Sequence, residues 1–291
     1  MPGRPVTGIS DRVGISLPEP TSMPEGHIIH RLAAEYARSF AGGPVAVSSP
    51  QGKFSDSAAL LDGQRMHGTD AHGKHLFLGF GPLGWVRIHL GLYGKVTFGD
   101  DPAPAPVGAV RLRLAGGGRW ADLRGPAACE LITDEEKRAV HARLGPDPLR
   151  DGDDPERAWA RISRSRAPIA ALLLDQRVIA GVGNVYRAEV LFRHGIDPYR
   201  PGCELTRAEW EALWSDLAGL MRQGVANGRI DTVRPEHTPE AMGRPPRVDD
   251  HGGEVYVYRR AGSPCHVCGA EIRTAELESR NLYWCPACQR R

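Results

Sequence analysis

The chain has 291 residues, of which 41% are hydrophobic and 25% charged, a composition typical of a globular protein long enough for two packed domains. This composition excludes collagen-like and mostly disordered chains. Apolar runs such as residues 169–174 are too short to cross a bilayer, and the start of the chain lacks the pattern of a secretory signal. The sequence therefore predicts a cytoplasmic protein with no membrane partner.

Positive charge is concentrated in one part of the chain. The whole chain has 37 basic and 35 acidic residues, and a net charge of +2 does not by itself indicate nucleic-acid binding. Residues 157–200, however, hold eight arginines against Asp175, Glu189 and Asp197, an excess of five positive charges. We expect a basic face in this segment that can attract phosphate groups.

The first half of the chain predicts one helix followed by a β-rich domain. Residues 1–23 are rich in Pro, Gly and Ser and predict a flexible tail or a misassigned start. Apolar residues then recur at helical spacing from Gly26 to Phe40. Alternating strand patterns follow at residues 74–80, 85–90, 95–100 and 110–114, with Gly or Pro between them. We predict a β-sandwich domain with a helix beside it over residues 24–150.

The second half is predicted to be helical, which makes the whole architecture α+β. An acidic stretch with several prolines, residues 145–156, marks the domain boundary, and helical patterns follow in residues 151–250. Residues 227–253 are polar and predict a loop. A cysteine-bearing tail, residues 255–291, forms a third unit.

The cysteine spacing predicts a metal site in this tail. Cys265 and Cys268 form one CxxC pair, and after sixteen intervening residues Cys285 and Cys288 form another. Four thiolates at this spacing close a tetrahedral site and leave no position for substrate, so we expect one structural Zn²⁺ ion. Disulfides are the alternative, and a reducing cytoplasm disfavours them.

A glycine-rich corner lies between two helical patterns. Gly181-Val-Gly183 ends an apolar segment, Asn184 stands at an N-cap position, and a helix is predicted from Val185. One interpretation is a phosphate site at the helix N-terminus. The other is a helix–helix corner capped by Asn184.

Seven motifs in a fixed order resemble the Fpg/Nei family of bifunctional DNA glycosylases. They are MPEGHIIHR from residue 23, GKHLFLGF, HLGLYG, DLRGP, RLGPDPL, LLLDQRVIAGVGNVYR and RNLYWCPACQ. The resemblance covers residues 23–291. It implies an N-terminal helix with a β-sandwich, a helix-two-turn-helix domain, a zinc-finger hairpin, and base-excision repair by glycosylase and AP lyase activity. The implied partner is damaged duplex DNA with a flipped lesion base or an abasic site, bound by a monomer in contact with the nucleoid.

The resemblance also assigns roles to individual residues. Pro24 is the nucleophile that forms a Schiff base with C1′ of the sugar, and Glu25 is the general acid. Lys74 contacts the phosphate beside the lesion and serves in β-elimination, and Arg280 binds a flanking phosphate and assists δ-elimination. The remaining implied DNA contacts are Asn184 for a phosphate, Leu92 and Tyr93 as wedge residues, and Arg124 and Arg143.

The role of Pro24 conflicts with its position inside the chain, because a peptide-bonded proline nitrogen has no available lone pair. A free α-amine has a pKa near 7.8 and is partly neutral at about pH 7.4, whereas an ordinary lysine is almost fully charged. We therefore expect translation to start at Met23 and this methionine to be removed. The functional chain would then have 268 residues and begin at Pro24.

The branch of the family decides the expected substrate. MPEGHIIH and LGLYG resemble endonuclease VIII, which implies oxidised pyrimidines such as thymine glycol and dihydrouracil. The alternatives are an oxidised-purine glycosylase of the same fold, acting on 8-oxoguanine or formamidopyrimidines, and a catalytically silent zinc-finger protein that binds damaged DNA.

Overall fold

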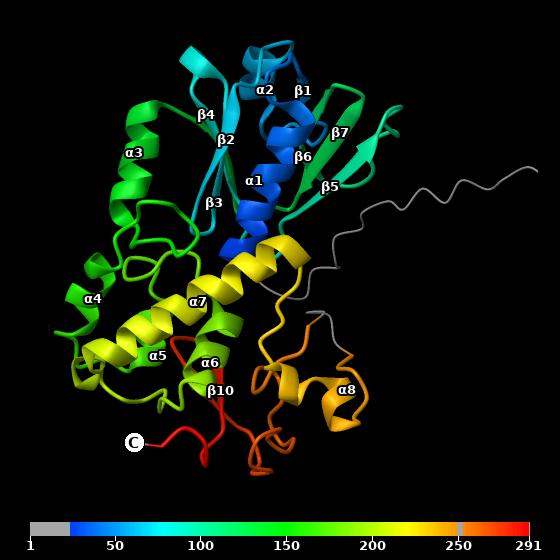
Figure 1. The fold of residues 1–291 in the computed structure, drawn as a ribbon. Coiled ribbons are helices and arrows are strands. Elements are labelled where there is room, and N and C mark those ends of the chain that lie inside the picture. Colours follow the sequence, from blue (N-terminus) through cyan, green and yellow to red (C-terminus); the bar gives the residue numbers. More distant parts are fainter. Residues whose placement is uncertain (1–23, 249–252, 291) are drawn as a thin grey trace, which may run out of the picture.

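The computed structural model describes residues 24–248 and 253–290, and the expected tail at residues 1–23 lies outside these described residues. Figure 1 shows a β-rich part that contains the first helix, and a helical part that carries a small C-terminal hairpin. Two large apolar cores correspond to these parts, one built on residues between Ile29 and Cys129 and the other on residues between Ala158 and Cys285.

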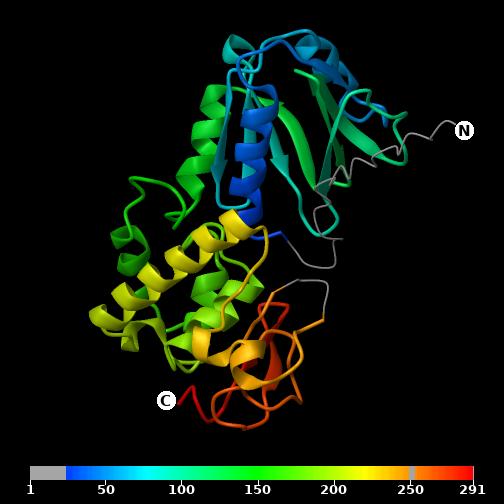
Figure 2. The same ribbon diagram turned by 45° about the vertical axis from the view of Figure 1, so that its right-hand side comes forward.

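The first helix forms where the apolar spacing predicts it. Helix α1 (Gly26–Phe40) buries Ile29, Leu32 and Tyr36 along one face, and it ends before Gly42. The buried face contacts strands of both sheets of the β-rich part. Figure 2 shows the first turn of α1 beside the end of α7 (Arg207–Asn227), which places the start of α1 at the junction of the two parts.

Two four-stranded antiparallel sheets form the β-rich part. One has the order β1-β6-β7-β5, and the other has the order β2-β3-β4-β8. The four predicted strands are β3 (His75–Gly79), β4 (Trp85–His89), β5 (Lys95–Asp100) and β6 (Val110–Gly116). The structure adds β1 (Ala46–Ser48), β2 (Gly68–His72), β7 (Arg119–Arg124) and β8 (Ala128–Ile132), with α2 (Ser55–Leu61), a 3-10 turn η1 (Gly81–Leu83) and α3 (Asp134–Arg143).

The helical part is built around α6 (Asn184–Arg193), whose side chains from Val185 to Phe192 are all buried. The other elements are α4 (Glu156–Ile162), α5 (Ile169–Leu174), α7, α8 (Pro239–Met242), η2 (Gly202–Glu204) and η3 (Pro235–His237). Helix α6 begins one residue earlier than predicted, with Gly183 as its N-cap. The predicted N-cap role of Asn184 is therefore wrong, and its side chain is free to bond elsewhere.

The C-terminal hairpin packs against α6 through its second strand. Strands β9 (Arg273–Leu277) and β10 (Arg280–Trp284) are joined by Glu278 and Ser279, which both have left-handed backbone angles, with φ of 54° and 55°. Tyr283 packs edge-on against Tyr258, and Trp284 against Tyr199. Both aromatic residues of β10 therefore pack the hairpin against the rest of the chain.

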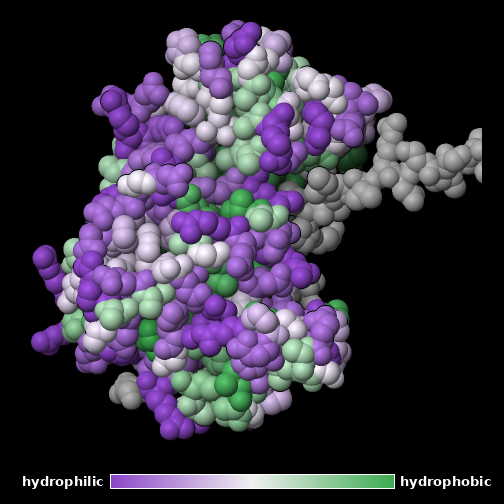
Figure 3. Space-filling view, in the orientation of Figure 1, coloured by the Kyte–Doolittle hydropathy of each residue, from purple (hydrophilic) through white to green (hydrophobic). Residues whose placement is uncertain are grey.

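The surface is mainly hydrophilic on the face that Figure 3 shows. Among the described residues, no helix is both long and apolar enough to cross a membrane.

Candidate active site

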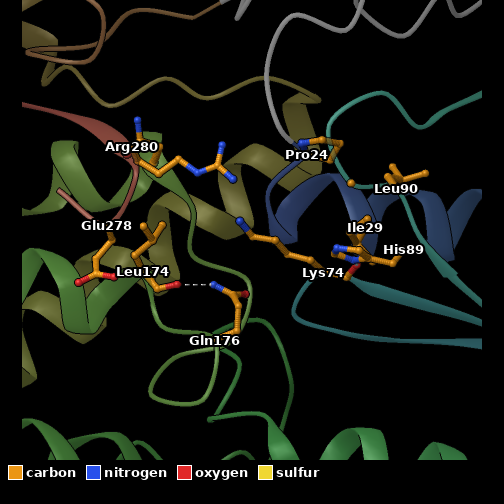
Figure 4. A pocket seen from close by; sticks show the side chains of 11 residues that line it. Pro24, Ile29, Lys74, His89, Leu90, Leu174, Gln176, Glu278 and Arg280 are labelled. Atoms are coloured by element: carbon orange, nitrogen blue, oxygen red, sulfur yellow. Dashed lines mark hydrogen bonds between the residues drawn. The ribbon is translucent and has the colours of Figure 1, made fainter. Parts of the chain in front are cut away.

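A pocket of about 330 Å³ lies where the start of α1, the β-rich part, the helical part and the hairpin meet. Figure 4 shows Lys74 and Arg280 pointing toward each other from opposite sides, with Pro24 beside them. Four residues predicted from the sequence line it: Pro24, Lys74, Asn184 and Arg280. The other lining residues, for which the sequence predicted no role, are Ile29, His89, Leu90, Gly91, Leu174, Gln176 and Glu278.

Glu25 follows the pocket-lining residue Pro24 and binds the start of a distant helix. Its buried carboxylate accepts hydrogen bonds from the backbone N–H groups of Gly183 at 2.9 Å and Val185 at 2.7 Å, with a longer one from Tyr186 at 3.4 Å. A helix N-terminus favours such an anion through its unpaired N–H groups and its dipole. Glu25 therefore stabilises α6, and its side chain makes no capping bond to its own helix α1.

This contact changes the interpretation of the GVGN corner. The first backbone amides of α6 bind the protein's own carboxylate, so the prediction that they receive an external phosphate is wrong. Gly183 is required there because a Cβ at this position would lie 2.5 Å from Glu25 Cδ. What the glycine approaches closely is thus a carboxylate of the same chain.

Lys74 and Glu25 form a buried pair of opposite charges. Lys74 is only 9% exposed, although a lysine in a turn is ordinarily solvated. Burial raises the pKa of Glu25, while the charge of Lys74 and the backbone hydrogen bonds act in the opposite direction. Burial likewise lowers the pKa of Lys74, and Glu25 partly offsets that effect. Both shifts favour neutral forms, which makes proton exchange near neutral pH easier for each group.

The turn that carries Lys74 is held by Asp147, which sequence reasoning missed. One carboxylate oxygen of Asp147 accepts hydrogen bonds from Gly73 N at 2.7 Å and from His30 Nε2 at 2.8 Å, and the other accepts from Leu149 N at 2.9 Å. Burial would raise the pKa of Asp147, but the bond and charge of His30, together with the hydrogen bonds from Gly73 and Leu149, hold this pKa below its ordinary value. Asp147 lies in the RLGPDPL motif, four residues after Arg143.

Three glycines form the junction between Glu25 and Lys74. Gly26 N donates to Gly181 O at 2.8 Å, and a Cβ at Gly26 would lie 2.8 Å from Gly181 Cα. A Cβ at Gly73 would lie 2.9 Å from Ala180 Cβ, and Gly73 and Gly181 both have positive φ. These three backbone segments therefore touch with no side chain between them.

Asn184 joins α6 to the hairpin at the edge of the pocket. Its Nδ2 donates to the carbonyl of Asn281 in β10 at 2.8 Å, and its Oδ1 accepts from Arg187. Arg280, the neighbour of Asn281, extends into the pocket.

The other predicted DNA contacts lie outside the pocket. Leu92 and Tyr93, in the turn between β4 and β5, are 46% and 79% exposed. A Cβ at Gly125 would lie 3.0 Å from Tyr93 O, so the turn after Arg124 lies beside them. The Arg124 guanidinium bonds Asp122 and the carbonyl of Val107, whereas Arg143 is exposed at the end of α3.

The four tail cysteines come together as the spacing predicts. The Sγ atoms of Cys265, Cys268, Cys285 and Cys288 all lie within 4.8 Å of one another, and all four are unbridged. Cys265 and Cys288 are 3.9 Å apart at sulfur, and Cys268 and Cys285 are 3.4 Å apart. Sulfurs of a tetrahedral zinc site with Zn–S bonds near 2.3 Å are about 3.8 Å apart, so the cluster fits zinc. No other such cluster occurs in residues 24–248 and 253–290.

The remaining cysteines stand alone in the described structure. Cys129 is buried and Cys203 is exposed, and neither forms a disulfide. Both are therefore free thiols outside the cysteine cluster.

Three family models match successive parts of the chain. The formamidopyrimidine-DNA glycosylase N-terminal domain matches residues 23–129, and the formamidopyrimidine-DNA glycosylase H2TH domain matches residues 144–234. A zinc finger found in FPG and IleRS matches residues 262–291. Together these matches span both apolar cores and the cysteine cluster.

Full-length relatives agree with the domain matches. A protein of Mycobacterium tuberculosis named endonuclease 8 1 is 55% identical over 92% of this chain and 100% of its own length. A formamidopyrimidine-DNA glycosylase of Parasynechococcus marenigrum is 32% identical over 79% of this chain and 83% of its own. Among solved structures, Lactococcus lactis Fpg in complex with abasic-site DNA superposes with a TM-score of 0.74, covering 92% of this chain and all of that one at 22% identity.

Proposed function

The chain belongs to the family of formamidopyrimidine-DNA glycosylases and endonuclease 8, the base-excision repair enzymes that combine glycosylase and AP lyase activity, and we propose that its substrates are oxidised pyrimidines in DNA. The 55% identity to proteins named endonuclease 8 supports this substrate class over oxidised purines.

The observation that carries the proposal is the convergence of Pro24, Lys74 and Arg280 on one pocket, with Glu25 next to Pro24 in the chain and bonded to the start of α6. These residues come from three segments far apart in the sequence. A nucleophile, an acid and two cations placed together are what glycosidic bond cleavage next to a phosphate requires.

We propose the following sequence of steps. The neutral amine of Pro24 attacks C1′ and the C1′–N bond to the base breaks, so that the base leaves with the proton released by the Pro24 nitrogen. Glu25, whose pKa burial raises, donates a proton to O4′ as the sugar ring opens, which leaves an iminium between Pro24 and C1′. The neutral amine of Lys74, a buried group with a lowered pKa, then accepts a C2′ proton, and the C3′–O bond breaks to release the 3′ phosphate.

The mechanism requires a free amine at Pro24. We therefore propose that the active form starts at Pro24 after removal of Met23. Two observations support this start: the N-terminal family model matches from residue 23, and the 55% identical relatives align over their full length with 92% of this chain.

Bound DNA would be held by cations and by a wedge. We propose that Lys74, Asn184 and Arg280 contact phosphates around the lesion, and that Arg124 and Arg143 contact the backbone farther away. Leu92 and Tyr93 would fill the gap left by the flipped base, a role that suits exposed apolar side chains at a turn.

We further propose one zinc ion with a structural role, held by Cys265, Cys268, Cys285 and Cys288. Four thiolates leave no open position for substrate, and the hairpin that carries Arg280 has few apolar residues of its own. The enzyme would act as a monomer on the chromosome in the cytoplasm.

Borohydride trapping on a duplex with one abasic site tests the mechanism. A chain beginning at Pro24 should form a covalent adduct, and mass spectrometry should map the adduct to the first residue. Lys74→Ala should slow strand cleavage, whereas Lys95→Ala, on the exposed side of β5, should not. Absence of an adduct from the chain beginning at Pro24, or an adduct on Lys74, would overturn the mechanism.

Defined lesions test the substrate class. Duplexes with thymine glycol or dihydrouracil should be cleaved faster than duplexes with 8-oxoguanine in the same sequence context. The reverse order would replace oxidised pyrimidines by oxidised purines.

A further inference from the structure

Arg187 is a buried cation that the steps above do not use. It lies on α6 one turn after Asn184, with 0% of its surface exposed. Its guanidinium donates to Asn184 Oδ1 and, at 3.5 Å, to the carbonyl of Ala170. Within the described part of the chain, no carboxylate forms an ion pair with it, and its Nε has no hydrogen-bond partner.

Such a group is costly for the fold. Burial lowers the pKa of Arg187 to about 10, with Glu25 and Glu278 near enough to offset part of the effect and Arg280 adding to it. An unbranched apolar side chain of similar length would fill the same space without desolvating a charge, and such replacements are often neutral or stabilising. Packing alone therefore does not account for an arginine at this position.

What the guanidinium does, and an apolar side chain could not do, is to orient an amide. The side chain of Asn184 presents an acceptor on one side and a donor on the other. Arg187 has donors only, so Oδ1 must face it and Nδ2 must face outward. The outward Nδ2 then donates to the Asn281 carbonyl, which is one residue from Arg280.

We propose that Arg187 is a positioning residue that fixes the side-chain amide of Asn184 and, through the Asn281 carbonyl, sets the position of Arg280 toward the bound DNA strand. The inference rests on the proposed function, because it takes the pocket to bind a phosphate backbone. Arg187 itself is set back from the pocket lining and acts through its neighbour.

The test measures binding to a duplex with a tetrahydrofuran abasic-site analogue, which the enzyme cannot cleave by elimination. Four proteins are compared: the wild type, Arg187→Met, Asn184→Ala, and the double variant. Arg187→Met should bind about 10-fold more weakly or worse, the range expected for a lost hydrogen bond to a charged group. The double variant should bind within about twofold of Asn184→Ala, because the arginine acts only through the asparagine.

Thermal unfolding separates positioning from structural support. Arg187→Met should keep its Tm within about 2 °C of wild type or raise it. Arg193→Met is the matched control on the same helix, since Arg193 is ion-paired with Asp216. Loss of that pairing should lower Tm, and its effect on DNA binding should add to that of Asn184→Ala.

Three results would overturn the inference: unchanged binding by Arg187→Met, additive effects of the two substitutions, or a fall in Tm that accounts for the weaker binding. Binding to the tetrahydrofuran duplex does not depend on catalysis. If the wild type binds this duplex but forms no borohydride adduct on the abasic-site duplex, the proposed mechanism is refuted. The test of Arg187 then remains valid.

Discussion

Gly183→Ala should dislodge the Glu25 carboxylate. The backbone of Gly183, with φ −124° and ψ −158°, is extended and acceptable to alanine, so the substitution strains no dihedral angle. The new Cβ, however, would lie 2.5 Å from Glu25 Cδ and 2.7 Å from Cγ and Oε1. Glu25 is enclosed and must leave its place.

The expected loss of stability follows from the two short hydrogen bonds that are broken, from Gly183 N and Val185 N. Hydrogen bonds to a charged group contribute about 1.5–3 kcal/mol each, or roughly 3–6 kcal/mol together. The reduced backbone freedom of alanine in the unfolded chain returns about 0.4–1 kcal/mol. A net loss of roughly 2–5 kcal/mol corresponds to a Tm lower by about 4–20 °C for a chain of this size.

The assay combines urea unfolding with abasic-site cleavage. Gly183→Ala should lose stability and cleavage together, because the displaced carboxylate is also the general acid in the proposed mechanism. Gly219→Ala is the matched control: it lies inside α7, its Cβ would meet nothing within 4 Å, and it should stabilise the protein by about 0.5–1 kcal/mol. In a Glu25→Ala background the clash is absent, so Gly183→Ala should cost little more. Wild-type stability and activity for Gly183→Ala, or additive losses with Glu25→Ala, would refute the reasoning.

Three further substitutions have separate expected outcomes. Cys268→Ser should release zinc to a colorimetric chelator and weaken DNA binding by disordering the hairpin; retention of one zinc per chain would contradict this. Tyr93→Ala should leave Tm nearly unchanged yet weaken binding to the abasic-analogue duplex about 10-fold, as expected for a lost stacking contact of about 1–3 kcal/mol; equal binding by anisotropy would argue against the wedge. Burial lowers the pKa of His27 to about 3, so between about pH 6.5 and pH 3 the histidine is neutral in the folded chain and protonated in the unfolded chain. Unfolding therefore takes up a proton in this range, and stability falls by about 1.4 kcal/mol for each pH unit toward 3. His27→Phe should remove this contribution in urea unfolding at pH 7 and pH 5, and an unchanged difference between the two would count against it.

The parts of the fold that could be predicted from the sequence are those with a local signal. Helix α1 has unbroken apolar spacing, and β5 matches its predicted bounds because Gly and Pro flank it. Strand β1 has only three residues, too few for its alternation to be recognised, and β2 is mostly half-buried and does not alternate. The cysteine cluster was predictable because two CxxC pairs already specify a tetrahedral site.

Most residues of the site could be predicted from the sequence, but only some of the contacts between them could. Lys74 and Arg280 were found through motifs, yet the burial of Lys74 depends on packing between segments far apart in the chain. The bond from Gly183 N to Glu25 joins residues 158 positions apart, and the bond from Gly73 N to Asp147 joins residues 74 apart. Neither has a signature in sequence spacing, because a carboxylate can accept from any amide that the fold brings near.

The contact of Gly26, Gly73 and Gly181 determines how far apart Glu25 and Lys74 lie. Glu25 precedes Gly26 and Lys74 follows Gly73, so the acid and the amine are each attached one residue from main chain that touches main chain. Their separation is therefore a property of backbone packing, largely independent of side-chain conformation. The turn with Leu92 and Tyr93 takes no part in this contact, so its sequence can vary while Glu25 and Lys74 keep their separation.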